Sequence, residues 1–198
     1  MAPRVTALVG EPRDRVRVEL DGAIWRVLPT AAVAGARLAV GAELDRPRAR
    51  TLRRELRRIE ALSVATAALK RRDHSTAELE ARLERGGISA AERGDALETL
   101  ERAGYVDDAR FAVARAAALA SRAYGDEAIR FDLEQRGLDA EIVAAALEVL
   151  EPEAVRARRL VARQGASATT ARRLATTGFS AETIETALGG ADVFAADG

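Results

Sequence analysis

The sequence predicts a mainly α-helical protein: three tandem three-helix repeats forming an elongated, curved array, preceded by a small N-terminal β-hairpin element. A unit centred on a glycine occurs three times, with spacings of 50 and then 41 residues between Gly87, Gly137 and Gly178. Leucines recur at the same two offsets, which indicates an internal repeat. Hydrophobic residues make up 48% of the chain but aromatic residues only 4%, and the abundant alanine and leucine favour helices.

The repeated unit combines the end of one helix with the start of the next. Its copies are Leu83-x-x-x-Gly87-Ile88-Ser89, Leu133-x-x-x-Gly137-Leu138-Asp139 and Leu174-x-x-x-Gly178-Phe179-Ser180. Glycine suits the left-handed position after a helix, where the following residue packs against the leucine. The serine or aspartate that comes next is a typical N-cap. Each repeat is therefore expected to carry two helices joined by a tight turn, after a third helix.

Residues 1–45 are expected to form the small β element. Val16, Val18 and Leu20 alternate with charged residues, and Asp21-Gly22 is typical of a type I′ hairpin turn. This register places Val18 opposite Trp25, so Trp25 is expected in the core. Residues 4–9 are a candidate third strand, and residues 29–44 are expected to form a short helix and a turn at Gly41.

A basic connecting helix is predicted over residues 46–61. Leu52, Leu56 and Ile59 form one apolar stripe, and between residues 46 and 58 the other faces carry seven arginines against a single acid, Glu55. Two interpretations stay open: contact with DNA phosphates or an acidic protein surface, and a solvated helix face. No strong breaker follows, so the helix is expected to continue to about Arg72.

The three repeats are predicted at residues 62–110, 111–152 and 153–190, with a loose tail at 191–198. In the first repeat, Ser75 and Glu78 have the spacing of a capping box. The run from Gly104 to Ala112 is expected to join two repeats, with Tyr105 and Phe111 buried. One of the neighbouring aspartates, Asp107 or Asp108, is expected to cap the helix that follows.

The run GYVDDARFA at residues 104–112, together with Tyr124-Gly125, Ile129-Arg130 and Arg136-Gly137-Leu138, resembles the RecX family of bacterial regulators of the RecA recombinase. The resemblance covers roughly residues 62–188 and is best in the first two repeats. In the third repeat, Thr176-Thr177 replaces a basic position and Thr170 an apolar one, so the resemblance implies no basic contact there. It implies a protein that binds the RecA filament on single-stranded DNA and restrains recombination and strand exchange.

The side chains that enzymes use are scarce in this sequence. His74 is the only histidine, cysteine is absent, and no glycine-rich phosphate loop occurs. The adjacent aspartates at 107 and 108 are better explained as helix caps. We therefore predict that the protein is not an enzyme and uses no cofactor or metal. Without an 18-residue apolar segment or a signal pattern, it is expected to be a cytoplasmic monomer without membrane contact.

The charge distribution bears on the partner. Residues 1–62 carry 13 basic and 8 acidic side chains, whereas residues 63–198 carry 18 and 23. A net acidic repeat region favours a protein partner over naked nucleic acid. The alternatives are a helical DNA-binding module and a scaffold for an unrelated protein. The predicted partner-binding residues are Lys70, Arg71, Arg72, Arg82, Arg122, Arg130 and Arg136 in the repeats and Arg53, Arg54, Arg57 and Arg58 in the connecting helix.

Overall fold

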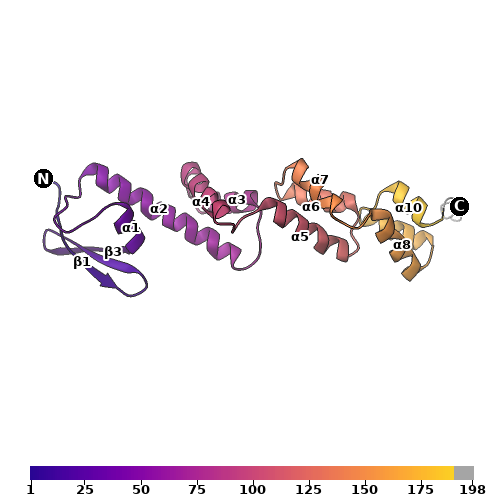
Figure 1. Cartoon of the computed structure of the whole chain (residues 1–198), viewed down its shortest axis with the longest axis horizontal. Helices are drawn as coiled ribbons and strands as arrows, with labels where there is room; N and C mark the ends of the chain where they lie inside the picture. Colours follow the sequence, from indigo (N-terminus) through magenta and orange to yellow (C-terminus); the bar gives the residue numbers. More distant parts are fainter. Residues whose placement is uncertain (190–198) are drawn as a thin grey trace. The chain divides into compact units, whose positions relative to one another are not determined.

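The structure is a computed structural model that describes residues 1–189 (Figure 1). It has an N-terminal three-stranded antiparallel sheet followed by helices, which confirms the predicted mainly helical class. The strands are β1 (Val5–Glu11), β2 (Arg15–Leu20) and β3 (Ala23–Pro29). The helices are α1 (Thr30–Gly35), α2 (Arg46–Leu69), α3 (Thr76–Arg85), α4 (Ala90–Arg102), α5 (Asp108–Ser121), α6 (Asp126–Gln135), α7 (Ala140–Glu148), α8 (Glu153–Gln164), α9 (Ala168–Thr176) and α10 (Ala181–Ala187). The tail expected at 191–198 lies outside the described residues.

The chain divides into two compact units. The first consists of residues 1–72 and 80–103, and the second of residues 73–79 and the chain from 104 onward. Helix α3 therefore contributes its first residues to the second unit and the rest to the first. This division runs through the first predicted repeat, so the boundaries proposed at 61/62 and 110/111 stay predictions. Within the described residues, no helix is both long and apolar enough to cross a membrane.

In the first unit, the three strands form a sheet in the order β1-β2-β3. Asp21 and Gly22 have φ values of 50° and 85°, as a type I′ turn requires, which confirms the predicted hairpin. The predicted pairing of Val18 with Trp25 is wrong, because a register shift places Val18 opposite Arg26. One extra residue in a strand reverses the face of the side chains beyond it, and Trp25 is 37% exposed as a result.

The connecting helix is continuous, as predicted. The Asp45 carboxylate caps α2 by accepting a hydrogen bond from the Arg48 amide at 2.9 Å. Leu52 is buried against the sheet and α1, and Leu56 and Ile59 are half-buried beside it. The expected short helix is α1, and Gly41 has a φ of 86° in the turn after it.

The three glycine turns have the predicted geometry. The φ values of Gly87, Gly137 and Gly178 are 75°, 73° and 81°. In every copy the amide after the glycine donates to the leucine carbonyl five residues earlier, at 3.1, 3.4 and 3.1 Å in chain order. These are the bonds of a Schellman motif. Each turn joins the second helix of a repeat to the third.

The N-caps after these turns follow the prediction at two of three places. Glu92 accepts hydrogen bonds from the Ser89 amide and hydroxyl at 3.2 and 2.6 Å. Ser180 accepts from the Thr183 amide at 3.3 Å. The prediction is wrong at Asp139, whose side chain makes no capping bond to α7.

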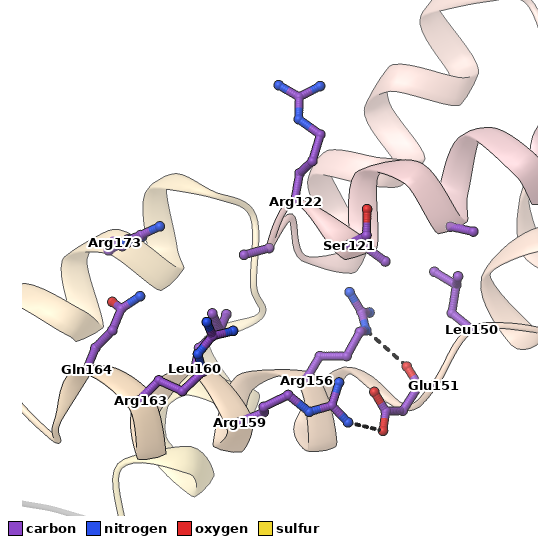
Figure 2. Close-up of a pocket in the computed structure, with 13 residues that line it drawn as sticks. Ser121, Arg122, Leu150, Glu151, Arg156, Arg159, Leu160, Arg163, Gln164 and Arg173 are labelled. Atoms are coloured by element: carbon purple, nitrogen blue, oxygen red, sulfur yellow. Dashed lines mark hydrogen bonds and ion pairs between the residues drawn. The ribbon is translucent and has the colours of Figure 1, made fainter.

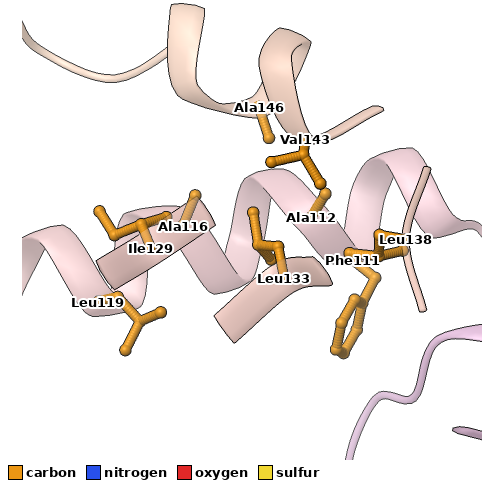
Figure 3. Packing of buried hydrophobic residues seen from close by; sticks show 9 residues of the cluster. All are labelled: Phe111, Ala112, Ala116, Leu119, Ile129, Leu133, Leu138, Val143 and Ala146. Carbon is orange, nitrogen blue, oxygen red and sulfur yellow. The ribbon is translucent and has the colours of Figure 1, made fainter. Parts of the chain in front are cut away.

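The second repeat illustrates how the alanine-rich helices pack (Figure 3). Ala112 and Ala116 are fully buried on α5 and face Val143 and Ala146 of α7, and Ile129 and Leu133 of α6 complete the layer. Alanine presents a small side chain, so α7 approaches α5 closely. The third repeat keeps the same plan. There, Thr170 is buried at the place of an aliphatic residue, and its hydroxyl donates to the Gly165 carbonyl at 2.8 Å.

Candidate functional site

Within the second unit, the same hydrogen-bonded joint connects consecutive repeats twice. In the first joint, Asp108 at the start of α5 accepts from the Thr76 amide of α3 at 2.8 Å. The Ser75 hydroxyl donates to the Arg136 carbonyl at the end of α6 at 2.7 Å. A carboxylate of one repeat thus caps the second helix of the repeat before it.

The second joint repeats this arrangement one repeat further along. Glu153 at the start of α8 accepts from the Asp126 amide of α6 at 2.7 Å, and the Gly125 amide donates to the Thr177 carbonyl at 2.9 Å. Hydrogen bonds from Asp126 and Ser180 lower the pKa of Glu153, against the opposing effect of burial. Helix termini therefore form both seams.

The sequence predicted the position of the first joint but only some of the contacts that form it. Asp107 caps α5 by accepting from the Arg110 amide at 2.9 Å, and its neighbour Asp108 serves the joint. Phe111 is buried as predicted. The predicted burial of Tyr105 is wrong, since its ring is 66% exposed and the seam is formed by helix termini instead.

Arg136, a predicted partner-binding residue, takes part in an internal ion-pair network. Its guanidinium lies 2.8 Å from Asp132 and 2.5 Å from Glu78, and its side chain is 22% exposed. Arg115 donates two hydrogen bonds to Asp132, at 2.9 and 2.7 Å. These guanidinium contacts, led by Arg115, hold the pKa of Asp132 well below its usual range. Arg136 is therefore engaged within the protein, and its role in binding a partner stays a prediction.

The single histidine lies beside this network. His74 Nδ1 is 3.0 Å from the Glu78 carboxylate, and the His74 side chain is 9% exposed. Among residues 1–189, no three side chains of the metal-ligating types gather into one group.

Most other predicted basic residues are exposed. Arg57 lies 3.6 Å from Glu92, and Arg58 is half-buried with its guanidinium 3.2 Å from Glu55. Arg122 and Arg130 belong to the second unit and the others to the first. The exposed members of the set are Arg53, Arg54, Arg57, Lys70, Arg71, Arg72, Arg82, Arg122 and Arg130.

The second unit also contains a basic groove that the sequence analysis did not anticipate (Figure 2). This open groove, of about 720 Å³, lies between the end of α5 and the length of α8, and α9 adds one residue to it. We call it the α5–α8 groove. Its charged lining residues are Arg122, Glu151, Arg156, Arg159, Arg163 and Arg173.

Arg156 holds the base of the groove together. It is 7% exposed, donates to the carbonyls of Glu151 and Tyr124 at 3.0 and 2.8 Å, and forms an ion pair with Asp126. Its guanidinium also lies 5.8 Å from the ring centre of Phe179. Arg156 is therefore a structural residue of the second joint.

The remaining arginines of the groove are exposed. Arg159 lies 2.6 Å from Glu151 and keeps 59% of its side chain exposed, and Arg122 lies 5.6 Å from the Tyr124 ring centre. Arg163 and Arg173 form no ion pair with any residue in 1–189. The third repeat thus supplies most of this basic surface. One feature of the sequence could have predicted this groove: the spacing of the arginines at 156, 159 and 163 places all three on one helix face.

Known proteins share part of this sequence and its fold. Residues 107–147 match the family described as RecX, second three-helix domain. The regulatory protein RecX of Xanthomonas campestris pv. campestris (strain B100) is 39% identical over 87 residues, which are 44% of this chain and 54% of that protein. The regulatory protein RecX of Stenotrophomonas maltophilia (strain R551-3) is also 39% identical over 87 residues, covering 44% of this chain and 53% of that protein. The chain thus spans about half the length of the curated relatives it matches.

Two solved structures share the fold. A crystal structure of regulatory protein RecX matches 93% of this chain and 98% of its own, with a TM-score of 0.79 and 19% identity. RecX from Lactobacillus salivarius matches 67% of this chain and 94% of its own, with a TM-score of 0.59 and 18% identity. The second repeat thus matches the RecX family at residues 107–147, and the chain shares its fold with these two RecX structures.

Proposed function

We propose that this protein regulates the RecA recombinase by binding the RecA filament on single-stranded DNA, and that it restrains recombination and strand exchange. The observation that carries the proposal is the match of residues 107–147 to the second three-helix domain of RecX. The curated relatives are described as regulatory proteins, which fits a protein that acts by binding and not by catalysis. The mechanism is steric and electrostatic, without a covalent step.

The surface of the repeats supports a protein partner. Arg82 on α3 and Arg130 on α6 are exposed, and neither forms an ion pair with a residue in 1–189. Phe131, next to Arg130, is 64% exposed. Arginine and aromatic side chains are enriched among the residues that dominate protein–protein binding energy. These side chains are exposed, so they are available to a partner.

The test is a charge reversal at both arginines. Arg82→Glu with Arg130→Glu should weaken binding to RecA assembled on single-stranded DNA by about tenfold or more, measured by filament pull-down or anisotropy. The matched control is Arg13→Glu with Arg158→Glu, which reverses one exposed arginine in each unit. Because surface substitutions usually change stability by less than about 0.5 kcal/mol, both variants should keep the wild-type melting temperature.

A second experiment tests whether the protein prefers the RecA filament over free RecA. Wild-type protein should be retained by RecA on single-stranded DNA and far less by free RecA. Equal loss of binding in the arginine pair and the control pair would contradict a specific role for Arg82 and Arg130. Retention by neither form of RecA would contradict the proposed function itself.

A further inference from the structure

We propose that the α5–α8 groove binds the phosphate backbone of duplex DNA directly, without RecA. The proposal concerns a different surface from Arg82 and Arg130, and it goes beyond the proposed function. It begins with charge: five guanidinium groups line the groove, and of these Arg156 is paired with Asp126 and Arg159 with Glu151, which leaves Arg122, Arg163 and Arg173 as its excess positive charge. Guanidinium groups match phosphate geometry and remain charged at all physiological pH values.

The location of these charges strengthens the argument. Residues 63–198 are net acidic, so the groove is a local concentration of positive charge and not part of a uniformly basic domain. A concave site lined by charges of one sign focuses the electric field more than a convex surface does. Arg163 and Arg173 have no internal counter-ion in the described structure, and Arg159 is tied to Glu151 but remains mostly exposed.

The wall of the groove on the α5 side, opposite the arginines of α8, is lined by small side chains. On the α5 side the groove is lined by Ala117, Ala120, Ser121 and Ala123. Arg122 lies at the same end, with its guanidinium pointing away from the α8 arginines (Figure 2). The short side chains of this wall leave room for a sugar-phosphate chain to approach within reach of the arginines on α8. The Ser121 hydroxyl adds a small polar group at the same wall.

The lining also favours duplex DNA over a single strand. Within the described residues, no aromatic side chain lines the groove. Proteins that bind single strands typically combine basic charge with aromatic platforms on which unpaired bases stack. A groove that offers charge without stacking suits a duplex, because its bases are already stacked and its phosphates face outward.

The basic helix α2 is the competing surface. Arg53 and Arg54 are exposed on its outer face, but Arg57 and Arg58 have acidic neighbours in Glu92 and Glu55. Arg163 and Arg173, by contrast, line one groove from two different helices and form no ion pair with a described residue. The two surfaces belong to different compact units, so they can be mutated independently.

The test measures duplex binding by the full-length protein without RecA, by fluorescence anisotropy over a series of salt concentrations. Arg163→Glu with Arg173→Glu should weaken binding by about tenfold or more at low salt. It should also make the slope of log K against log salt shallower by about 1 to 2, because each phosphate contact contributes nearly one unit. Arg163→Gln with Arg173→Gln, which introduces no repulsion, should show a smaller loss in the same direction.

The matched control is Arg53→Glu with Arg54→Glu, an identical change of charge on α2. The groove proposal requires the control to lose less affinity than the groove variant. Equal losses would assign the binding to net charge, and unchanged duplex affinity in the groove variants would overturn the proposal. A single strand that binds more tightly than a duplex of equal length would overturn the choice of duplex DNA. Filament binding in the Arg82 and Arg130 variant is measured separately, so either proposal can fail alone.

Discussion

At the scale of single residues, glycines with the same backbone conformation carry different constraints. Gly87 and Gly137 have φ values of 75° and 73°. A Cβ atom added to Gly87 would meet nothing within 4 Å, whereas one added to Gly137 would lie 2.5 Å from the Ala77 Cβ. Gly178 is as restricted as Gly137, because its Cβ would lie 2.5 Å from the Ala128 Cβ. The last two turns are therefore contact points of the joints as well as helix ends.

This difference predicts unequal costs for one substitution. Gly87→Ala should destabilise the protein by about 1–2 kcal/mol, the cost of left-handed backbone for a residue with a Cβ atom. Gly137→Ala carries the same strain and an added steric clash with α3, so its loss should be larger by about 1–3 kcal/mol. Urea unfolding of both variants measures the difference. Equal losses would mean that α3 moves away from the turn at no cost.

At the scale of helices, the Asp132 carboxylate links three elements. It lies on α6, accepts from Arg115 of α5, and shares Arg136 with Glu78 of α3. All these groups are mostly but not fully buried, with side-chain exposures between 19% and 31%. The network is therefore a tie between helix surfaces at the first joint, and the apolar core lies beneath it.

The low pKa of Asp132 predicts how this tie depends on pH. A carboxyl group with a depressed folded-state pKa stabilises the fold above its unfolded pKa of about 4, and this stabilisation is lost as the pH falls toward the folded value. Asp132→Asn should therefore cost on the order of 1–3 kcal/mol at pH 7. The difference from wild type should shrink as the pH falls from about 4 to about 3. Denaturant unfolding at several pH values measures this, and a pH-independent difference would exclude the ionised carboxylate as the cause.

At the scale of the whole molecule, the second unit has its own apolar cores. The core of the second repeat runs from Phe111 to Ala146, and that of the third from Ala157 to Ile184. Neither includes a residue from the N-terminal sheet or from α2. The joint that links these two repeats is formed by Asp126, Glu153 and Thr177, which all lie within the same unit.

Removal of the N-terminal region tests this autonomy. Deleting residues 1–61 should leave a helical protein that still melts cooperatively, because repeats two and three keep their cores and their joint. Circular dichroism during thermal unfolding measures the outcome. Loss of a cooperative transition would show that the repeats depend on the N-terminal sheet, and it would contradict the proposed boundary at residue 61.

The sequence by itself determined the features that depend on near neighbours. The glycine turns, the cap at Asp107, the type I′ turn and the continuous α2 each involve residues at most five positions apart. Local sterics and capping hydrogen bonds decide such features, so a single sequence is enough to predict them.

The tertiary structure decided the features that depend on distant residues. The bulge that exposes Trp25 arises from strand pairing, and Arg136 became internal because Glu78 lies beside it across 58 positions. Asp108 serves the joint, and not the cap of its own helix, because it accepts a hydrogen bond from the Thr76 amide, 32 residues away. The α5–α8 groove joins Arg122 to Arg163 and Arg173 across a repeat boundary. Such contacts follow from how the repeats pack on one another, and the local spacing of residues does not encode that packing.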